Sequence, residues 1–533
     1  MENKKINYLL PLLIALSIII GMWIEKALTR NHVDDSLFVY PQANKINTVI
    51  NYIIEEYVDS VSKDELIENT IPEILENLDP HSVYIPAEAL QHVNEPLEGN
   101  FDGIGVQFNI QKDTIMVVKV ITGGPSQLVG IMDGDRIVQI NGNNVASIGI
   151  STDSVMKLLR GPGGTKVDVG IVRHNVKEML DFTITRDKIP LYSVDVSYMI
   201  NDSTGFIKIS KFAKTTYDEF VDAVKKLQKQ NLKNLIIDLR GNSGGYMDAA
   251  TNIADEFLPR NTLIVYTQGR SRPKSMTYAS SRNLCINYDV IVLQDEFSAS
   301  ASEILAGAIQ DNDRGIIVGR RSYGKGLVQE PTMFSDGSAM RLTTARYYTP
   351  TGRSIQKPYT GGDDESYYND LGNRYMHGEF MQKDSIQFND SLKYKTPKGK
   401  IVYGGGGIMP DVFVPFDTTG NSDYFSKISR RGLEYQFAFE YTDKNRKSLS
   451  AYKNVTELNT FLESRINSIF TDFISFADKN GVKKNTADLT ISQELIKVRL
   501  KALIARNIFD NDGFYPIIQE VDKTLKTALE NFE

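Results

Sequence analysis

A chain of 533 residues is longer than a single hydrophobic core usually supports, so we expect roughly three or four domains. Its apolar fraction of 41% and aromatic fraction of 10% are typical of a folded protein. Acidic and basic residues are interspersed and leave a net charge of −7, so nothing in the composition indicates nucleic acid as a partner.

The N-terminus carries a membrane-targeting pattern. Lys4 and Lys5 precede an almost uncharged run over residues 6–24, which as a helix is about long enough to cross a hydrocarbon core of ~30 Å. We predict a single-pass signal anchor over residues 1–28; a cleaved signal peptide is the alternative, although its apolar part is usually shorter. The two lysines predict a cytoplasmic N-terminus in a bacterial inner membrane, with the rest facing the periplasm or exterior. The only cysteine, Cys285, excludes an intrachain disulfide and a lipid on this segment.

Residues 41–98 are predicted to form a small helical region. Apolar residues recur at a helical period over residues 44–58 and again over residues 63–78. The region ends with LDPHSVYIP, where His81 lies in a turn. We interpret this isolated histidine as a capping or packing residue, with catalysis as the alternative.

Residues 99–190 are predicted to form a compact β-domain, because short β-rich runs alternate there with turns rich in Gly, Pro and Asn. The segments GIGVQF, GGPSQLVGIMDGDRIVQINGNNV and LLRGPGGTKVDVGIVR together resemble a PDZ domain. In that family, the first loop offers backbone N–H groups to the carboxylate of a peptide's C-terminus, and the peptide then adds as a strand to the sheet edge. The resemblance assigns this role to Gly103, Ile104, Gly105 and Val106.

Strand-like and helix-like runs alternate over residues 191–358, which predicts an α/β core with largely parallel strands. A polar, turn-rich stretch at residues 359–407 is predicted to be an exposed insertion, and residues 408–415 return to the core. Residues 416–533 contain three amphipathic helical runs and are predicted to form a helical C-terminal domain. The fold class is therefore α/β, in an α+β multidomain chain.

The stretch SASASEILAGAIQD follows a strand-like run and begins a helix-like one, so its serines lie on a strand-to-helix turn. Ser300 and Glu303 fit a capping box, and for this stretch alone capping explains the pattern as well as catalysis does. The same turn sets the Ser300 hydroxyl at a helix N-terminus, where the dipole and free N–H groups favour negative charge.

Topology brings a lysine to this turn. The strand GIIVG, residues 315–319, follows the helix, and a strand, helix and strand of this length make a right-handed parallel crossover. Ser300 and Lys325 both lie just past the carboxyl ends of these strands, so they can meet at one edge of the sheet. The glycine-rich residues 241–245 follow another strand and reach the same edge.

Lys325 lies between two glycines and can be surrounded by the core, where burial lowers an amine pKa from about 10.4 towards neutrality. It could then accept the proton of Ser300, and Gln329 could orient its amine by a hydrogen bond. Such a pair replaces the histidine of other serine peptidases. The predicted oxyanion hole consists of the backbone N–H groups of Ala301, Gly244 and Gly245.

Nucleotide binding is the competing interpretation of the same lysine. GRRSYGKG, residues 319–326, matches the phosphate-binding loop except at its last position, where Gly326 replaces the hydroxyl that binds magnesium. The following LVQEPTMF favours a strand and a proline turn, whereas a phosphate loop opens a helix. We therefore reject this interpretation and expect no metal or organic cofactor.

These motifs, together with DLRGNSGG, LTTARYYTPTGRSIQ and GGIMPDVFVP, resemble the carboxyl-terminal processing (tail-specific) serine proteases over residues 46–415. The spacings of 25 residues from Ser300 to Lys325 and 4 residues from Lys325 to Gln329 agree with that family. The match makes Ser300 the nucleophile, Lys325 the base and Gln329 the third member. It leaves Ser298 and Ser302 as small turn residues.

The resemblance also implies a crotonase-like (ClpP-like) superfold and a serine endopeptidase whose PDZ domain captures disordered C-termini of exported proteins and gates the site. Arg160 matches an arginine that couples the PDZ domain to the active site in some members, with a solvated loop charge as the alternative. An activating adaptor or lipoprotein and a homo-oligomer are further partners to expect. The rival hypothesis is a non-catalytic PDZ scaffold, which has no need of Lys325 and Gln329.

Overall fold

The computed structural model describes residues 14–24, 45–173, 176–387 and 389–532, and the chain divides into two units, Met1–Ile71 and Pro72–Glu533. Helices α2 (Lys45–Glu56) and α3 (Lys63–Glu76) occupy the two helical runs predicted after the anchor. Residues 1–13 and 25–28 of the predicted anchor lie outside the described residues. Among the residues described, no helix combines the length and the apolar composition of a membrane span.

The PDZ-like region is a small β-domain around a core of Ile115, Val117, Ile137 and Val155. Its sheet has the order β3-β4-β5-β7-β8, so β3 is an edge strand, and the short β6 pairs with β5. The elements are β3 (Val106–Gln111), β4 (Thr114–Val120), α5 (Pro125–Leu128), β5 (Arg136–Ile140), β6 (Asn143–Asn144), α6 (Thr152–Leu159), β7 (Lys166–Val172) and β8 (Leu180–Thr185). Strand β2 (Asn100–Gly103) precedes this domain in the sequence and β9 (Asp187–Pro190) follows it, and the two strands pair antiparallel with each other.

The larger core is built on a six-stranded sheet of order β10-β11-β12-β15-β16-β21. All its strand pairs are parallel except β10 with β11, as the alternating pattern predicted. The strands are β10 (Val194–Met199), β11 (Thr204–Ile209), β12 (Asn234–Asp238), β15 (Asp289–Gln294), β16 (Ile316–Gly319) and β21 (Val412–Phe413).

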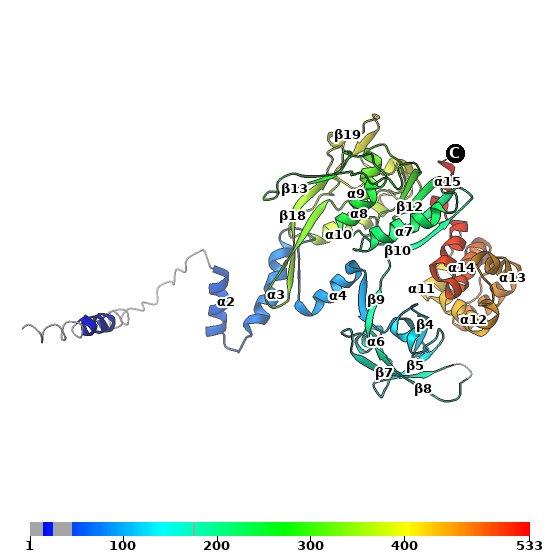
Figure 1. The fold of residues 1–533 in the computed structure, drawn as a ribbon, viewed down its shortest axis with the longest axis horizontal. Helices are drawn as coiled ribbons and strands as arrows, with labels where there is room; N and C mark the ends of the chain where they lie inside the picture. The colour runs from blue at the N-terminus through cyan, green and yellow to red at the C-terminus, as the bar shows by residue number, and fades with distance from the viewer. Residues whose placement is uncertain (1–13, 25–44, 174–175, 388, 533) are drawn as a thin grey trace, which may run out of the picture. The chain divides into compact units, whose positions relative to one another are not determined.

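Helices cover both faces of this sheet (Figure 1). Alternate strand residues such as Ile237 and Val292 pack against α7 (Thr216–Gln228), α8 (Met247–Asp255) and α9 (Ala301–Asp311). The intervening residues, including Ile236 and Leu293, pack against Leu525 of α15 (Lys523–Glu530). The last helix of the chain therefore completes the protease core.

A second sheet brings a distant segment to the core. Strands β17 (Leu327–Met333) and β18 (Ala339–Tyr348) pair antiparallel directly after the Lys325 loop. The short β1 (Val83–Ile85), which follows the LDPHS turn, pairs with β18. The same sheet contains β13 (Leu263–Gln268) and β14 (Ser275–Tyr278).

The remaining elements are mostly helical. Helix α4 (Ala87–Glu98) precedes the PDZ-like domain, and residues 359–407 contain α10 (Asp364–Met376), η2 (Lys383–Ser385), η3 (Asp390–Leu392), β19 (Lys393–Lys395) and β20 (Ile401–Tyr403). The C-terminal region has its own apolar core. Its helices are α11 (Asp423–Arg430), α12 (Leu433–Leu449), α13 (Val455–Lys479), α14 (Thr486–Ile518), η4 (Gln519–Val521) and α15.

Candidate active site

Ser300 lies on a strained turn between β15 and α9. Its φ of 56° is in the left-handed region, which is uncommon for a residue with a side chain and costs on the order of 1–3 kcal/mol. The Ser300 N–H donates to Glu303 Oε2 at 2.8 Å, which is the glutamate half of the predicted capping box. The surrounding structure therefore holds this serine in a conformation that it would not adopt alone.

The three serines of the stretch differ in their surroundings. Ser298 is buried, and its hydroxyl donates to the Leu239 carbonyl at 2.8 Å. Ser302 is also buried, and its hydroxyl donates to the Asn242 carbonyl at 2.9 Å. Both side chains tie the turn to the glycine-rich loop, as expected of turn residues, whereas Ser300 is only half-buried. Accessibility thus favours the middle serine as a nucleophile.

One buried carboxylate joins the serine turn to the lysine loop. Glu303 Oε2 accepts the N–H groups of Ser300 at 2.8 Å and Lys325 at 2.9 Å, while Oε1 accepts the Gly324 N–H at 2.7 Å and the Ser322 hydroxyl at 2.5 Å. Burial raises the pKa of Glu303 to about 7, although these four hydrogen bonds lower it. The crossover therefore brings the Ser300 and Lys325 main chains to a common carboxylate.

The phenol of Tyr347 makes the second link between these loops. Its hydroxyl lies 3.1 Å from the Ser300 carbonyl oxygen and 2.7 Å from that of Lys325. The Tyr347 side chain is fully buried in the core. Ser300 and Lys325 are thus fixed through both their N–H and their carbonyl groups.

The environment of Lys325 suits a general base. Burial lowers the pKa of the Lys325 amine below its ordinary value. The negative charge of Asp79 opposes this effect, and the positive charge of Arg341 adds to it. A larger neutral fraction of the amine makes proton acceptance near neutral pH easier.

Gln329 lies on β17 opposite Thr343 of β18. Its Nε2 donates to Thr343 Oγ1 at 3.1 Å, and that hydroxyl donates to Asp79 Oδ1 at 2.9 Å. The structure thus gives Gln329 a hydrogen bond within the sheet. Its predicted hydrogen bond to the Lys325 amine stays a prediction.

The LDPHS turn lies beside the lysine, a placement that the sequence analysis missed. Asp79 is buried and accepts N–H groups from His81 at 2.9 Å and Ser82 at 3.1 Å. His81 Nε2 lies 2.9 Å from the Tyr367 hydroxyl, in keeping with the predicted packing role. Burial, and then the charge of Lys325, lowers the pKa of His81 to about 4. The pairing of β1 with β18 brings this turn to the site, and only the long-range sheet reveals it.

The glycine-rich loop lies directly against Ser300. A Cβ on Gly244 would be 2.8 Å from the Ser300 Cβ and 3.1 Å from the Ala301 nitrogen, and its φ is +104°. On Gly245, a Cβ would be 2.1 Å from the Phe212 carbonyl oxygen. Only glycine fits this close approach. The Gly244 N–H donates to Asn242 Oδ1 at 2.8 Å, and the predicted oxyanion hole stays a prediction.

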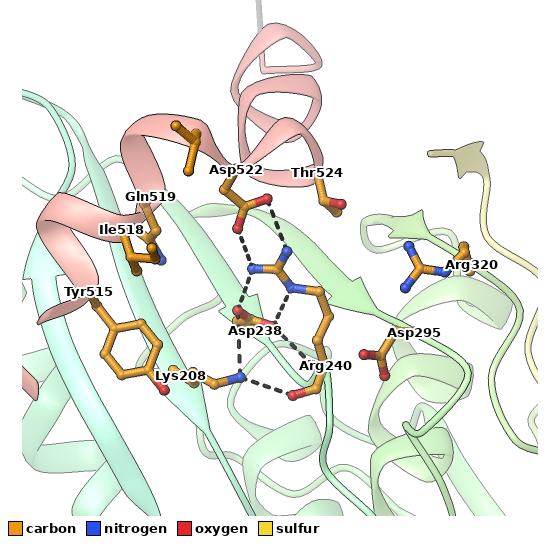
Figure 2. A pocket seen from close by; sticks show the side chains of 11 residues that line it. Lys208, Asp238, Arg240, Asp295, Arg320, Tyr515, Ile518, Gln519, Asp522 and Thr524 are labelled. Atoms are coloured by element: carbon orange, nitrogen blue, oxygen red, sulfur yellow. Dashed lines mark hydrogen bonds and ion pairs between the residues drawn. The ribbon is translucent and has the colours of Figure 1, made fainter. Parts of the chain in front are cut away.

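Behind this loop, an ion-pair network connects it to the C-terminal helices. Figure 2 shows the Arg240 guanidinium between the carboxylates of Asp238 and Asp522. Arg240 Nη2 lies 2.7 Å from Asp238 Oδ2 and 2.7 Å from Asp522 Oδ2. Asp522 also caps α15, and Lys208 Nζ donates to the Arg240 carbonyl at 2.9 Å. The start of the loop is thus anchored to a helix far along the chain.

The other predicted binding residues lie in the PDZ-like domain. Residues 103–106 form the loop that leads into the edge strand β3, and the Ile104 carbonyl accepts the Ser126 hydroxyl at 2.6 Å. Gly105 has a φ of +76°, and a Cβ there would be 3.1 Å from Ile189 Cδ1. The loop lies at the start of the free edge of β3, and its predicted binding of a peptide carboxylate stays a prediction.

Arg160 connects the PDZ-like domain to α4. Its Nη1 lies 2.7 Å from Glu95 Oε2 and 3.1 Å from His92 Nδ1, and its guanidinium carbon lies 4.5 Å from the centre of the Phe101 ring. Arg160 therefore forms an ion pair with Glu95 between the PDZ-like domain and α4, and it is not a solvated loop charge.

The lysine loop does not continue as a phosphate-binding loop. Strand β17 begins at Leu327, directly after Gly326, where a phosphate loop would open a helix. Within the described part of the chain, no group of three or more His, Cys, Asp or Glu side chains is placed to hold a metal ion.

Comparison with known proteins identifies the chain's family. Residues 203–365 match peptidase family S41, residues 116–173 match the PDZ domain, and residues 424–510 match a family of unknown function (DUF8443). The carboxy-terminal-processing protease of Bartonella bacilliformis is 34% identical over 361 residues, which are 67% of this chain and 81% of that protein. The chain belongs to the carboxy-terminal processing proteases of family S41.

A second bacterial relative agrees with this membership. The carboxy-terminal processing protease CtpB of Bacillus subtilis is 34% identical over 429 residues, which are 79% of this chain and 85% of that protein. The solved structure of a photosystem II D1 C-terminal processing protease is 26% identical, with a TM-score of 0.34, and the match covers 61% of this chain and 93% of that one. The chain is a serine-type S41 peptidase with a PDZ domain, as its motifs predicted. The membership supports the catalytic interpretation over the non-catalytic scaffold.

Proposed function

We propose that this S41 peptidase cleaves exported proteins after its PDZ domain has captured their disordered C-terminal tails, with Ser300 as nucleophile and Lys325 as base. The observation that carries the proposal is the carboxylate of Glu303, which accepts the N–H groups of both residues at 2.8 and 2.9 Å. The lowered pKa of the lysine amine supports the role of base.

The proposed reaction passes through an acyl-enzyme. The Ser300 oxygen attacks the peptide carbonyl carbon while its proton moves to the neutral Lys325 amine. The resulting ammonium then donates this proton to the leaving nitrogen, and the C–N bond breaks. Lys325 next takes a proton from water, whose oxygen attacks the ester carbon. The lysine ammonium then returns this proton to the Ser300 oxygen as the C–O bond to Ser300 breaks, which releases the acid and restores both residues.

Two further groups have proposed roles in this cycle. The N–H groups of Ala301 and Gly245, and that of Gly244 in exchange for its hydrogen bond to Asn242 Oδ1, are proposed to hold the oxyanion, because the glycine loop lies directly against the serine turn. Gln329 is proposed to orient the lysine amine, whereas in this structure its Nε2 donates to Thr343 Oγ1.

Tail capture is proposed for residues 103–106 and the unpaired edge of β3. The names of the Bartonella bacilliformis and Bacillus subtilis relatives support it, since both are carboxy-terminal processing proteases. An activating adaptor or lipoprotein and a homo-oligomer remain proposed partners. Arg160 is proposed to couple tail binding to the site through Glu95 of α4.

The proposed location is a bacterial inner membrane, with one N-terminal span and the peptidase facing the periplasm or exterior. The two lysines before the apolar run of residues 6–24 support it. For the core we propose the crotonase-like superfold, supported by parallel strands covered with helices on both faces.

The test uses a reporter protein with an unstructured C-terminal tail and the purified chain. Ser300→Ala and Lys325→Ala are expected to abolish cleavage while the circular dichroism spectrum stays unchanged. Ser391→Ala, at an exposed serine of the insertion, serves as the control and should cleave normally. Full proteolysis by Ser300→Ala, or a fluorophosphonate label on Ser298 or Ser302 instead, would overturn the assignment.

A further inference from the structure

The C-terminal helical domain touches the PDZ-like domain beside its unpaired strand. Lys112, just after β3, forms an ion pair with Glu440 of α12 at 3.3 Å. Asn109 of β3 and Tyr435 of α12 line the same cavity. A further ion pair joins Arg136 of β5 to Asp443 of α12 at 3.6 Å. These contacts fix the position of α12 relative to the sheet edge on which a tail would add.

A cavity of about 410 Å³ lies between these two elements. Residues 109–112 line one side, and Gly432, Tyr435, Gln436 and Glu440 line the other. The Nε2 of Gln111 in its wall is buried without a hydrogen-bond partner among the described residues. A buried donor without an acceptor is unfavourable, so an acceptor carried into the cavity by a tail would stabilise this atom.

The register of a bound tail leads to this cavity. A tail whose carboxylate is held by residues 103–106 pairs antiparallel with β3 and advances one residue for each residue of the strand. Asn109 and Gln111 lie three and five positions beyond Val106, so roughly the fourth and sixth residues from the end of the tail lie beside them.

The side chains of β3 alternate between two faces of the sheet, and this alternation determines which tail side chains point towards the cavity. Phe108 and Ile110 of β3 pack against the PDZ core, whereas Asn109 and Gln111 point to the opposite face, where α12 lies. Tail side chains directly opposite Asn109 and Gln111 share their face. These side chains therefore project towards the cavity and towards Gln111 Nε2.

We propose that α12 completes a second subsite for substrate tails, in which a polar side chain about four to six residues from the C-terminus accepts a hydrogen bond from Gln111. The inference rests on the proposed tail capture and extends it. Residues 424–510 match a family of unknown function. The proposed role of this region is to bind the part of the tail that precedes its last few residues.

The test measures binding of fluorescein-labelled peptide pools to the full chain carrying Ser300→Ala. All pools are randomised at the last four residues. Peptides of the short pool consist of these four residues alone. In the polar pool the four residues are preceded by Gly-Gly-Asn-Asn, and in the apolar pool by Gly-Gly-Leu-Leu. Amidated copies of each pool report binding that does not depend on the carboxylate. We expect the polar pool to bind about fivefold more tightly than the short and apolar pools.

Substitutions in the cavity lining test whether the tighter binding of the polar pool arises there. Gln111→Met removes the donor at similar volume, and Gln436→Trp fills the cavity from α12. Both should bring the polar pool to the affinity of the short pool and leave the short pool unchanged. Lys444→Ala, at an exposed position of the same helix, should alter neither.

The outcomes separate this inference from the tail capture on which it rests. The subsite is overturned, and tail capture stands, if binding requires the free carboxylate but the short, polar and apolar pools have equal affinity. The same conclusion follows if the cavity variants weaken binding of the short and polar pools equally. Equal binding of carboxylate and amidated pools, or none by either, overturns both.

Discussion

The main-chain N–H groups of Ser300 and Lys325 donate to the same carboxylate oxygen, Glu303 Oε2, at 2.8 and 2.9 Å. The two residues come from different loops, each after a parallel strand, and a single acceptor sets the separation of their main chains. Because reacting groups must be held within fractions of an ångström, this acceptor controls the geometry of the proposed pair.

Replacing that acceptor should impair turnover more than binding. Glu303→Gln keeps the size of the side chain, but its amide nitrogen replaces one of two oxygens that together accept four donors. We expect kcat to fall about tenfold or more while KM changes little. Steady-state kinetics on a tailed reporter measures both. An unchanged kcat in a folded variant would mean that the carboxylate is not needed for alignment.

Activity should rise with pH through the titration of Lys325. Only the neutral amine can accept the serine proton, so activity is lost as pH falls below the pKa of the lysine. Because burial lowers that pKa, the midpoint of kcat/KM against pH should lie below the ordinary value of 10.5. A rate profile with no rising limb on the alkaline side would contradict the proposed base.

The contact between Gly244 and Ser300 predicts a contrast between two glycines. Gly244→Ala places a methyl group 2.8 Å from both the Ala299 oxygen and the Ser300 Cβ, at a φ of +104°, so the serine turn has to shift. Gly241→Ala meets nothing within 4 Å and bears only the strain of its φ of +73°. Gly244→Ala should lose nearly all cleavage, and Gly241→Ala should retain most of it. Similar losses in the two variants would refute the contrast.

The ion pair between Arg240 and Asp522 should support both stability and activity. Asp522→Ala leaves a half-buried guanidinium with one carboxylate partner and removes the cap of α15, which should destabilise the fold by about 1–3 kcal/mol. Asp512→Ala removes the same charge from an exposed position and should have almost no effect. Urea unfolding of the two variants measures the difference, and equal stabilities would show that the pair contributes nothing.

Local pattern and topology predicted that the loops of Ser300 and Lys325 come to one edge of the sheet, where their main chains share Glu303, because strand order and crossover handedness follow from short segments. They missed Asp79, which reaches the site only because β1 pairs with β18 far along the chain. The hydrogen bond of Gln329 to Thr343 follows from the register of the β17–β18 hairpin, which a spacing motif does not contain. The helical tail carried no recognisable chemistry, yet Asp522 lies behind the glycine loop. Residues joined across hundreds of positions leave no periodic signal in a single sequence.

The packing of α15 on the parallel sheet also sets an order of events during synthesis. Strands β11, β12, β15 and β16 leave the ribosome long before α15, and until that helix arrives the face that includes Ile236 and Leu293 remains exposed to water. Arg240 then lacks one of its two carboxylates, and the loop against Ser300 lacks its anchor. Until α15 is in place, the chain therefore carries every proposed catalytic residue without the contacts that anchor the glycine loop beside Ser300.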